Sequence, residues 1–499
     1  MDIFQVVLLP LISFIFLIIF LHGWRSAAPQ RRQPPSPRKL PIIGNLHQLG
    51  SYPHRSLQSL SKRYGQLMLL HFGSVPVIIA SSSEAACEIM KNQDLIFSNR
   101  PKLSIPDRIT YGSRDVAFAP YGEYWRQVRS ICVLHLLSNK KVQSFRRVRE
   151  EETTLMVEKM RGLGGVVNLS DVLVTLTNDV VCRVALGRKY GGDGEGKKFQ
   201  KLLKEFVECL GTFNVGDYVP RLAWVDRING LDAKVERVAK MFDEFLEGVL
   251  QEHRDQRKRE KVRDGDDDFV DILLDFQREN RNSSPVEDEA IKALIMDMFA
   301  AGTDTTVSVL EWTLAELIRN PRTMKALTSE VREVAGIKED IEEDDLEKMP
   351  YLKAVIKETL RLHSPIPLLV PRESTQDTKV LGYDIASNTR VVINAWAIAR
   401  DPLLWENPEE FYPERFLDSR IDFRGLHFEL IPFGAGRRGC PGIAFAMAVD
   451  ELALGKLVHN FNFGLPNGER EEDIDMTEAN ALTVHKRFPL LVLADSHII

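Results

Sequence analysis

The residues around Cys440 suit a thiolate that binds a metal. Residues 432–442 read Pro-Phe-Gly-Ala-Gly-Arg-Arg-Gly-Cys-Pro-Gly, so that four glycines surround Cys440. Such a loop can make tight turns that bring backbone N–H groups close to the sulfur. An apolar stretch of helical character, 443–461, follows at once, and the dipole at its N-terminus favours a negative sulfur. A thiolate surrounded by hydrogen-bond donors suits an axial ligand of haem iron.

A second segment places small and hydroxyl residues inside a helix. Residues 300–306 read Ala-Ala-Gly-Thr-Asp-Thr-Thr and lie within the amphipathic stretch 289–320, which predicts a helix. Small side chains let a flat cofactor approach the backbone, and Thr and Asp side chains compete for its hydrogen bonds. Taken alone, the string is also consistent with a polar helix face. Likewise Glu358 and Arg361, at i and i+3, would alone indicate a surface ion pair.

The spacing around the cysteine is that of a known family. Phe433, Gly436, Arg438, Cys440 and Gly442 match in full the haem-binding signature of the cytochrome P-450 superfamily, which the chain therefore resembles. The resemblance implies that Cys440 is the axial thiolate ligand of the iron of haem b. It also implies that Arg438 pairs with a haem propionate and that Phe433 lies against the cofactor.

Residues outside this loop match the same family. Trp125 and Arg129, four residues apart, resemble a family pair that holds a propionate, and the planar fork of arginine suits a carboxylate. Arg372 and Arg100 are further candidates for the propionates. Ala301 is expected to lie over the haem.

The resemblance assigns chemistry to one pair of residues and a structural role to a triad. Asp304 and Thr305 match the family pattern Ala/Gly-Gly-x-Asp/Glu-Thr, whose acid and alcohol direct protons to the bound dioxygen. They are the expected catalytic residues. Glu358 and Arg361, with Arg415 of the later Pro-x-Arg-Phe segment, resemble a buried triad that supports the haem side of the fold.

The resemblance also places a substrate pocket. Its expected wall residues are all apolar or small, which suits a hydrophobic ligand, although each could equally pack the core. Besides Ala301 they are Phe118, Phe299, Ile366, Leu369, Val370 and Leu482.

The implied activity is that of a monooxygenase, which inserts one oxygen atom from O2 into its substrate. The chain has no Gly-rich nucleotide fingerprint and no flavin module, so electrons are expected from NADPH through a separate cytochrome P-450 reductase. Basic residues such as Arg126, Lys140, Lys141 and Arg437 are expected to form the docking face for that reductase.

The proline hinge and the two motif strings resemble the plant microsomal A-type group, family seventy-one. Segments 62–65, 214–220 and 478–486 look especially like the menthofuran synthases, which oxidise a monoterpene ketone. The expected substrate is therefore a small hydrophobic plant secondary metabolite of the terpenoid class. Coumarins or other phenylpropanoids are the alternative, because psoralen-synthase-like members are a second neighbour.

Two other functions stay open as remote alternatives. Haem-thiolate isomerases and dehydratases rearrange peroxides without dioxygen, but they typically lose the acid and alcohol that are present here as Asp304 and Thr305. A non-enzymatic haem carrier or sensor needs no proton relay at all.

The elements that must position these groups begin with a membrane anchor. Residues 3–21 are apolar apart from three positions, and these nineteen residues at about 1.5 Å each reach about 28 Å, close to the bilayer core. Basic residues follow, so the positive-inside rule places the body in the cytoplasm. We expect a single transmembrane helix over 1–23, in the endoplasmic reticulum membrane, and then a basic, proline-rich hinge over 24–50.

Residues 51–499 are expected to form one haem-thiolate catalytic domain, mainly α with a small β lobe, which is the cytochrome P-450 fold. The pattern predicts a hairpin over 67–80 and strand-like runs at 368–370 and 389–393. The mixed charge run 252–268 predicts a surface loop. A net charge of −6 argues against a nucleic-acid surface, and the scattered cysteines indicate free thiols.

Overall fold

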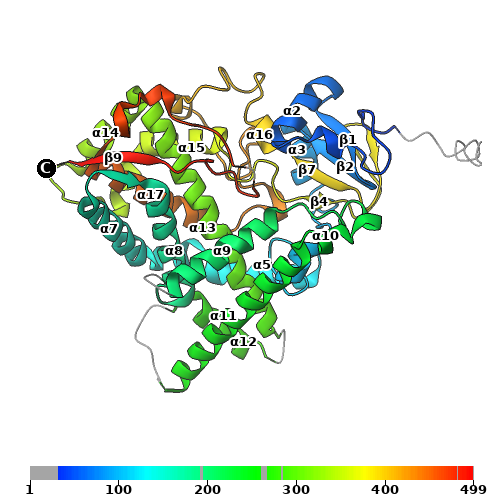
Figure 1. Ribbon diagram of the computed structural model, residues 1–499, viewed down its shortest axis with the longest axis horizontal. Helices are drawn as coiled ribbons and strands as arrows, with labels where there is room; N and C mark the ends of the chain where they lie inside the picture. The colour runs from blue at the N-terminus through cyan, green and yellow to red at the C-terminus, as the bar shows by residue number, and fades with distance from the viewer. Residues whose placement is uncertain (1–31, 191–194, 260–266, 282–284, 480, 498–499) are drawn as a thin grey trace, which may run out of the picture.

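The computed structural model describes residues 32–190, 195–259, 267–281, 285–479 and 481–497. The predicted anchor over 1–23 and the first part of the predicted hinge lie outside the described residues. The described chain is a large helical body with a small sheet lobe beside it (Figure 1), which is the predicted division into mainly α structure and a small β part.

The long helix α13 (Asp288–Arg319) runs through the middle of the helical body (Figure 1). It is apolar on nearly every face and therefore buries its side chains against helices all round it. By length and composition it is the one helix of the described part that could cross a membrane, but most of it is buried inside the protein. The helices packed on it are α8 (Leu169–Leu186), α9 (Glu195–Gly211), α11 (Leu231–Arg259), α12 (Phe269–Glu279), α14 (Pro321–Ala335), α15 (Pro350–Leu362) and α17 (Ile443–Asn460).

Shorter helices connect this body to the sheet lobe and cover its edges. α7 (Arg146–Leu163) is longer than these and packs between α8 and α17. The others are α2 (Pro53–Tyr64), α3 (Ser83–Cys87), α4 (Ser104–Ile109), α5 (Glu123–Ile131), α6 (Asn139–Ser144), α10 (Val225–Ile228) and α16 (Ala395–Ile398).

The main sheet has the order β1-β2-β7-β4. The predicted hairpin is confirmed: β1 (Leu67–Phe72) pairs antiparallel with β2 (Val75–Ala80). β7 (Arg390–Ile393) joins β2 in parallel, and β4 (Arg372–Glu373) closes the edge. Two smaller sheets contain β3 (Val166–Asn168), β9 (Leu491–Ser496) and β8 (Phe461–Gly464), and the pair β5 (Thr378–Val380) and β6 (Tyr383–Ile385).

Two local predictions are wrong. Residues 368–370 form no strand, because Leu369 has a φ of 52° and its N–H bonds to Ile366 O at 3.0 Å, which makes a turn. The charge run 252–268 does not begin as a loop, since α11 continues to Arg259. Glu, Gln, Lys and Arg are good helix formers, and pairs such as Lys258 with Asp255 bridge successive turns there.

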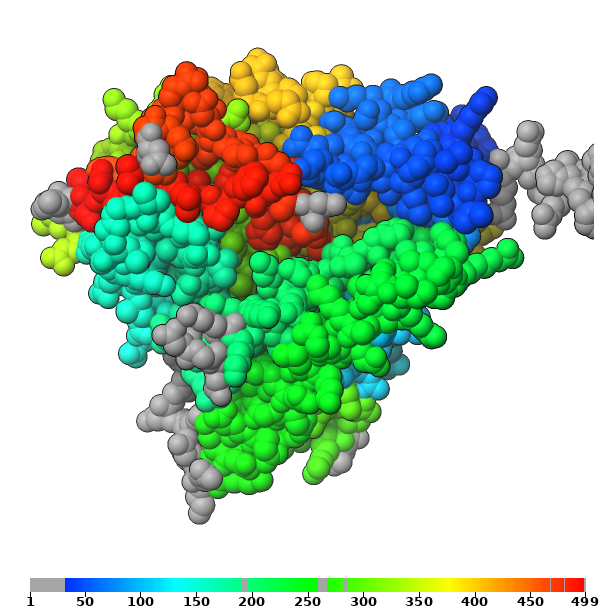
Figure 2. All heavy atoms as spheres, in the orientation of Figure 1, coloured from blue at the N-terminus to red at the C-terminus, as the bar shows by residue number. Residues whose placement is uncertain are grey.

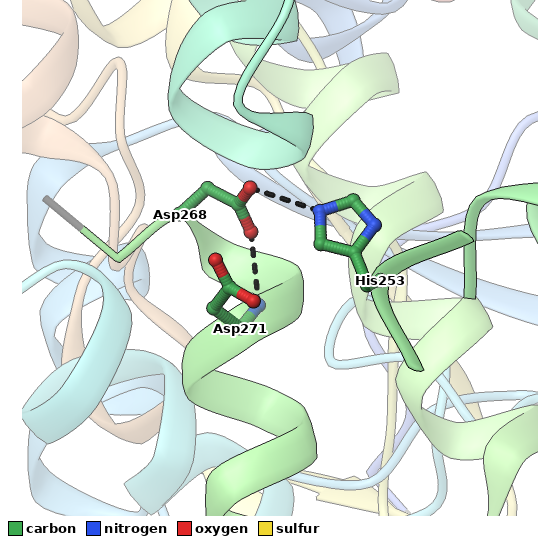
Figure 3. Close-up of side chains that lie close together, drawn as sticks. All are labelled: His253, Asp268 and Asp271. Atoms are coloured by element: carbon green, nitrogen blue, oxygen red, sulfur yellow. Dashed lines mark hydrogen bonds and ion pairs between the residues drawn. The ribbon is translucent and has the colours of Figure 1, made fainter. Parts of the chain in front are cut away.

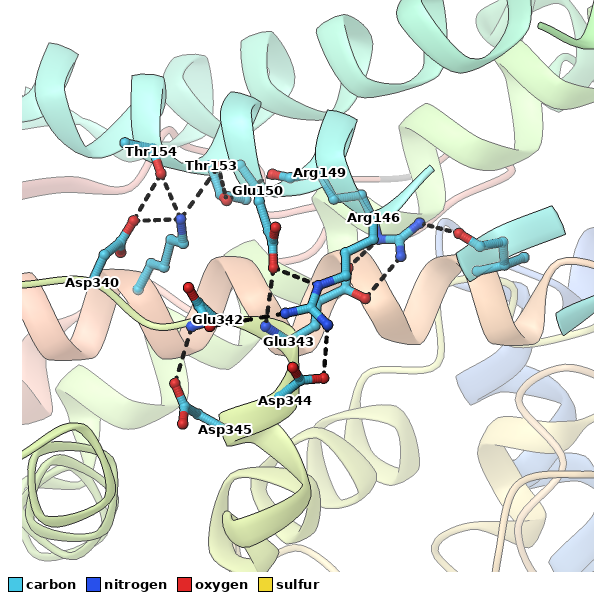
Figure 4. A network of polar contacts seen from close by, with 12 residues as sticks. Arg146, Arg149, Glu150, Thr153, Thr154, Asp340, Glu342, Glu343, Asp344 and Asp345 are labelled. Carbon is cyan, nitrogen blue, oxygen red and sulfur yellow. Dashed lines mark hydrogen bonds and ion pairs between the residues drawn. The ribbon is translucent and has the colours of Figure 1, made fainter. Parts of the chain in front are cut away.

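A polar network joins α7 to the connection that follows α14 (Figure 4). Arg149 is fully buried, and its Nε and Nη2 lie 2.5 and 2.9 Å from the carboxylate oxygens of Glu343. Thr154 of α7 and Asp340 of that connection both lie 2.6 Å from the buried Lys456 Nζ of α17. The contacts of Lys456 fix α17, the helix that follows Cys440, against its neighbours.

The C-terminal segment lies across the surface between the N-terminal lobe and the helical body, as the red and blue atoms of Figure 2 show. Glu478 ties it to α2, with His54 Nε2 at 3.1 Å and Arg55 Nη2 at 2.9 Å. Further along, β9 pairs with β3. The C-terminal segment, which contains His485, is thereby held against the N-terminal half of the protein.

Candidate active site

A cavity of about 250 Å³ lies between α13 and the loop that contains Cys440. One wall consists of Phe433, Gly434, Cys440 and the start of α17, and the opposite wall of Ala301, Gly302 and Thr305 on α13. The lining is mostly apolar, and its charged residues gather at one edge. A flat apolar group with negatively charged substituents along one side fits this arrangement.

The Cys440 loop is folded as its glycines require. Gly436 has a φ of 68°, and a Cβ there would lie 2.2 Å from Met90 O, so only glycine fits. Cys440 N–H donates to Phe433 O at 2.9 Å, and Gly442 N–H donates to the Cys440 sulfur at 3.3 Å. Burial raises the pKa of the Cys440 thiol, and this N–H opposes the rise. A bound metal cation would stabilise the thiolate against the cost of burial.

Four arginines line one edge of the cavity: Arg100, Arg129, Arg372 and Arg438. Burial lowers the pKa of all four, that of Arg438 to about 9, and the charge of Arg372 lowers the pKa of Arg438 further. Their hydrogen bonds to protein go chiefly to backbone carbonyls, such as Arg129 Nη2 to Gly439 O at 2.6 Å. Asp94 pairs with Arg372 at 3.2 Å, and Asp115 faces Arg438. Positive charge nevertheless remains in excess, and the two propionates of haem would offset it.

Trp125 supports one of these arginines. Its indole N–H donates to Val116 O at 3.1 Å, and the Arg438 guanidinium lies 4.1 Å from its ring centroid. Arg438 also donates to Ser98 O and Ala119 O at 2.7 and 2.6 Å. The direct contact between Trp125 and a propionate stays a prediction.

The two expected catalytic residues lie on different sides of α13. Thr305 lines the cavity, and its hydroxyl donates to Ala301 O one turn earlier. Asp304 does not line it; its Oδ1 contacts His485 Nε2 at 3.0 Å. Asp304 Oδ2 is buried with no hydrogen-bond partner in the described part of the chain. A proton relay would therefore run from His485 in the C-terminal loop through Asp304 to Thr305, which lies on the cavity side of α13.

The structure gathers some of the expected substrate residues and not others. Ile366, Leu369 and Val370 line the cavity together, in the turn that replaces the predicted strand. Phe118 and Leu482 are not among the lining residues. Phe299 is not among the lining residues either: its side chain is fully buried, and its ring lies 5.1 Å from that of Phe199 in the core. It lies on a different face of α13 from residues 298, 301, 302 and 305, which line the cavity.

The remaining predicted triad is present and buried. Glu358 and Arg361 are fully buried, with Arg361 Nε and Nη2 each 2.8 Å from a Glu358 oxygen. Arg415 Nε contacts the same carboxylate at 3.1 Å. The pair is therefore not a surface ion pair; it joins α15 to the segment that leads into the Cys440 loop.

Sequence reasoning missed three ionisable groups near this site. Asp297 lines the cavity one turn before Ala301, and that spacing on α13 was the available signal. Its partner Asp115 lies in the loop before Trp125, and no local pattern marks it. His485, the partner of Asp304, follows Asp304 by more than a hundred residues, so only the tertiary structure brings the two together.

A second cluster resembles a metal site but is satisfied without a metal. His253, Asp268 and Asp271 lie close together between α11 and α12 (Figure 3). His253 Nδ1 contacts Val249 O at 2.8 Å and its Nε2 contacts Asp268 at 2.9 Å, so both ring nitrogens act as donors of an imidazolium. Asp268 caps α12 by accepting from Asp271 N–H. The cluster is a helix-joining ion pair.

Comparisons with known proteins agree with this geometry. A family model described as Cytochrome P450 matches residues 34–492. The chain is 63% identical to Cytochrome P450 71A6 of Nepeta racemosa, covering 98% of this chain and 99% of that protein. It is 59% identical to (+)-menthofuran synthase of Mentha piperita, with 97% of each chain covered. Norfluorocurarine oxidase of Strychnos sp is 56% identical, over 97% of this chain and 96% of that protein.

Among solved structures, a zebra fish cytochrome P450 with abiraterone superimposes with a TM-score of 0.75. It is 25% identical in sequence, and the match covers 89% of this chain and 100% of that chain.

Proposed function

The chain belongs to the cytochrome P450 family, and we propose that this haem-thiolate monooxygenase oxidises a small, hydrophobic, monoterpene-like terpenoid. The observation that carries the proposal is the mostly apolar cavity between Cys440 and Thr305, whose charged lining residues are the four arginines expected to hold the propionates and Asp297. An uncharged hydrophobic substrate suits such a wall. The likeness to a menthofuran synthase favours the terpenoid class.

Bound haem b supplies the activation of dioxygen and the insertion of one oxygen atom. The chain's own residues would hold and orient it: Cys440 would ligate the iron, and the four arginines would bind the propionates. Thr305 holds a hydroxyl at the cavity wall, and Asp304 passes protons toward it from the side of His485. Ile366, Leu369 and Val370 orient the substrate.

Electrons reach this site from NADPH through a separate reductase, in keeping with the family. We place the docking face on Arg126, Lys140, Lys141 and Arg437. Arg126→Glu with Lys140→Glu should slow transfer of the first electron, since opposite charges steer the encounter. An unchanged rate of reduction would remove this face from the proposal.

The membrane arrangement is part of the same proposal. Residues 1–23 anchor the protein in the endoplasmic reticulum membrane, residues 24–50 act as the hinge, and 51–499 form the cytoplasmic catalytic domain. Extraction of microsomes with alkaline carbonate tests the anchor: the full chain should remain in the pellet, and a chain lacking 1–23 should be released.

The deciding experiment uses microsomes that contain this chain and a plant reductase. The reduced carbon monoxide spectrum first establishes thiolate-ligated haem. NADPH and pulegone are then supplied, and oxygenated product is sought by mass spectrometry. Product supports the terpenoid proposal. Spectrally intact enzyme without product rejects pulegone and moves the search to other terpenoids, coumarins and alkaloids, whereas turnover without NADPH would favour an isomerase or dehydratase.

A further inference from the structure

Two carboxyl groups meet beside the cavity, and the mechanism above uses neither. Asp115 is fully buried in the loop between α4 and α5. Asp297, on α13, is half-buried because part of it faces the cavity. The two carboxyl groups lie close enough together that the charge and hydrogen bonding of Asp115 raise the pKa of Asp297. A hydrogen bond between two carboxyl groups requires a proton on one of them.

Each carboxyl also receives backbone N–H groups from the loop 116–119. Val116 N–H donates to Asp297 Oδ2 at 2.7 Å, and Phe118 N–H donates to Asp115 Oδ2 at 2.9 Å. Thr110 Oγ1 donates to Asp115 Oδ1 at 3.1 Å. The two acids therefore bind backbone N–H groups of the same loop.

The carbonyl side of the same loop faces the arginines. Val116 O accepts from Arg438 Nη1 at 3.2 Å, and Ala119 O accepts from Arg438 Nη2 at 2.6 Å. Ala117 O accepts from Arg100 Nε at 2.8 Å. The loop thus connects the two acids directly to two of the four guanidinium groups expected to bind the propionates.

The charges around the pair favour one shared proton. Burial and the charge of Asp115 raise the pKa of Asp297 well above its ordinary value, and burial raises that of Asp115. The charge of Arg100 acts in the opposite direction on Asp115, and Arg438 faces the same carboxyl. Tyr124 and Cys132 also face the acids, and burial raises the pKa of each, so both are uncharged at neutral pH. Two carboxylates in contact at such a site cannot both ionise without cost.

We infer that Asp115 and Asp297 act as one carboxyl–carboxylate pair with a single shared proton, which positions the 116–119 loop and thereby Arg100 and Arg438 for the cofactor. Both acids are positioning residues, since they act through the loop and the arginines. The inference rests on the proposed haem site but is independent of the substrate.

The test compares haem release from the purified, haem-containing full chain with release from Asp297→Asn and Asp297→Ala, using the transfer of haem to an acceptor protein. The asparagine side chain keeps an oxygen for Val116 N–H and supplies an N–H to Asp115, so it needs no shared proton. The wild type should release haem at least about tenfold faster at about pH 10 than at about pH 7, as a shift of one pKa unit requires. Asp297→Asn should show a smaller rise, because only the loss of charge on Arg438, whose pKa is about 9, remains, and Asp297→Ala should release haem rapidly at both values.

A matched control comes from Asp226, another buried carboxylate, which accepts from Val215 and Gly216 N–H groups at 3.1 and 2.8 Å in a different loop. Asp226→Asn should keep the alkaline rise of the wild type. The inference is overturned if Asp297→Asn shows the same rise as the wild type, or if it loses haem at neutral pH as quickly as Asp297→Ala. Absence of thiolate-ligated haem in the wild type at neutral pH would instead refute the proposed function.

Discussion

His485 in the C-terminal loop contacts Asp304 of α13, with 3.0 Å between Nε2 and Oδ1. The loop is fixed in this position, because Val484 O accepts from Ser308 Oγ at 2.8 Å and from Trp312 Nε1 at 2.9 Å. Burial would lower the pKa of His485, but the hydrogen bond and charge of Asp304 outweigh it and raise that pKa. The expected proton donor of the active site thus has a basic partner whose pKa is raised.

Removing this imidazole should uncouple electron consumption from oxygenation. His485→Leu leaves Asp304 without its partner, and product formed per NADPH should fall about tenfold or more, the scale of a lost acid–base group. Because the pKa of His485 is raised above its ordinary value, wild-type coupling should be highest below that pKa and should decline as the pH rises through it. His485→Gln keeps an N–H donor but does not titrate, so its coupling should be independent of pH. Unchanged coupling in both variants would exclude His485 from proton delivery.

The buried triad of Glu358, Arg361 and Arg415 should be needed to retain the fold of the haem side. Glu358→Gln leaves two guanidinium groups without their counter-ion, which costs about 3–5 kcal/mol of the free energy of unfolding. Denaturant unfolding and haem content per chain measure this. Glu343→Gln is the control, because it breaks the buried pair with Arg149 at α7; it should lower stability yet leave haem affinity unchanged. Wild-type stability of Glu358→Gln would show that the triad contributes little.

The arginine cluster should be a cost to the protein without cofactor and a gain with it. Arg438→Met removes one of several like charges, which offsets the loss of its hydrogen bonds to Ser98 O and Ala119 O, so the haem-free chain should lose little stability. The same change should weaken haem retention about tenfold to a hundredfold, the value of one charge-assisted hydrogen bond. Haem added to the two haem-free proteins should therefore raise the wild-type melting temperature more. Arg437→Met, at the more exposed neighbour paired with Asp94, should behave as the wild type.

Much of this site could be predicted because its residues are adjacent in sequence. The Cys440 loop, the 300–306 string and the Glu358–Arg361 spacing each lie within one turn or helix, where local geometry limits what the side chains can do. The face of α13 on which Phe299 lies and the positive φ of Leu369 could not be predicted, because both depend on packing. Asp115, Asp297 and His485 could not be paired at all, since their partners come from distant segments.

The His253 ion pair should stabilise the junction of α11 and α12 only while the imidazole is charged. Burial would lower the pKa of His253, but the hydrogen bond and charge of Asp268 raise it. A raised pKa means that this stabilisation is fully present below the ordinary value of about 6.5 and is lost as the pH rises through the folded-state pKa. His253→Gln should therefore cost about 1–3 kcal/mol at about pH 6 and less at about pH 9.

Thermal unfolding across this pH range measures the effect of His253, with exposed His47→Gln as the control. A cost that is the same at all pH values would mean that the imidazole is neutral in the folded protein. Addition of Zn²⁺ should leave the wild-type melting temperature unchanged, because both ring nitrogens already donate hydrogen bonds.

Asp450 on α17 should destabilise the protein at neutral pH. It is fully buried, neither carboxyl oxygen has a hydrogen-bond partner in the described part of the chain, and burial raises its pKa well above the ordinary value. The folded state must therefore take up a proton that the unfolded state lacks, so stability is lost as the pH rises from about 4 toward the raised pKa. Asp450→Asn needs no proton and should equal the wild type near pH 4, then exceed it by about 1–3 kcal/mol near pH 8. Asp418→Asn, at an exposed aspartate, should change nothing. If Asp450→Asn were less stable at every pH, the carboxyl group would have to make an interaction that an amide cannot replace.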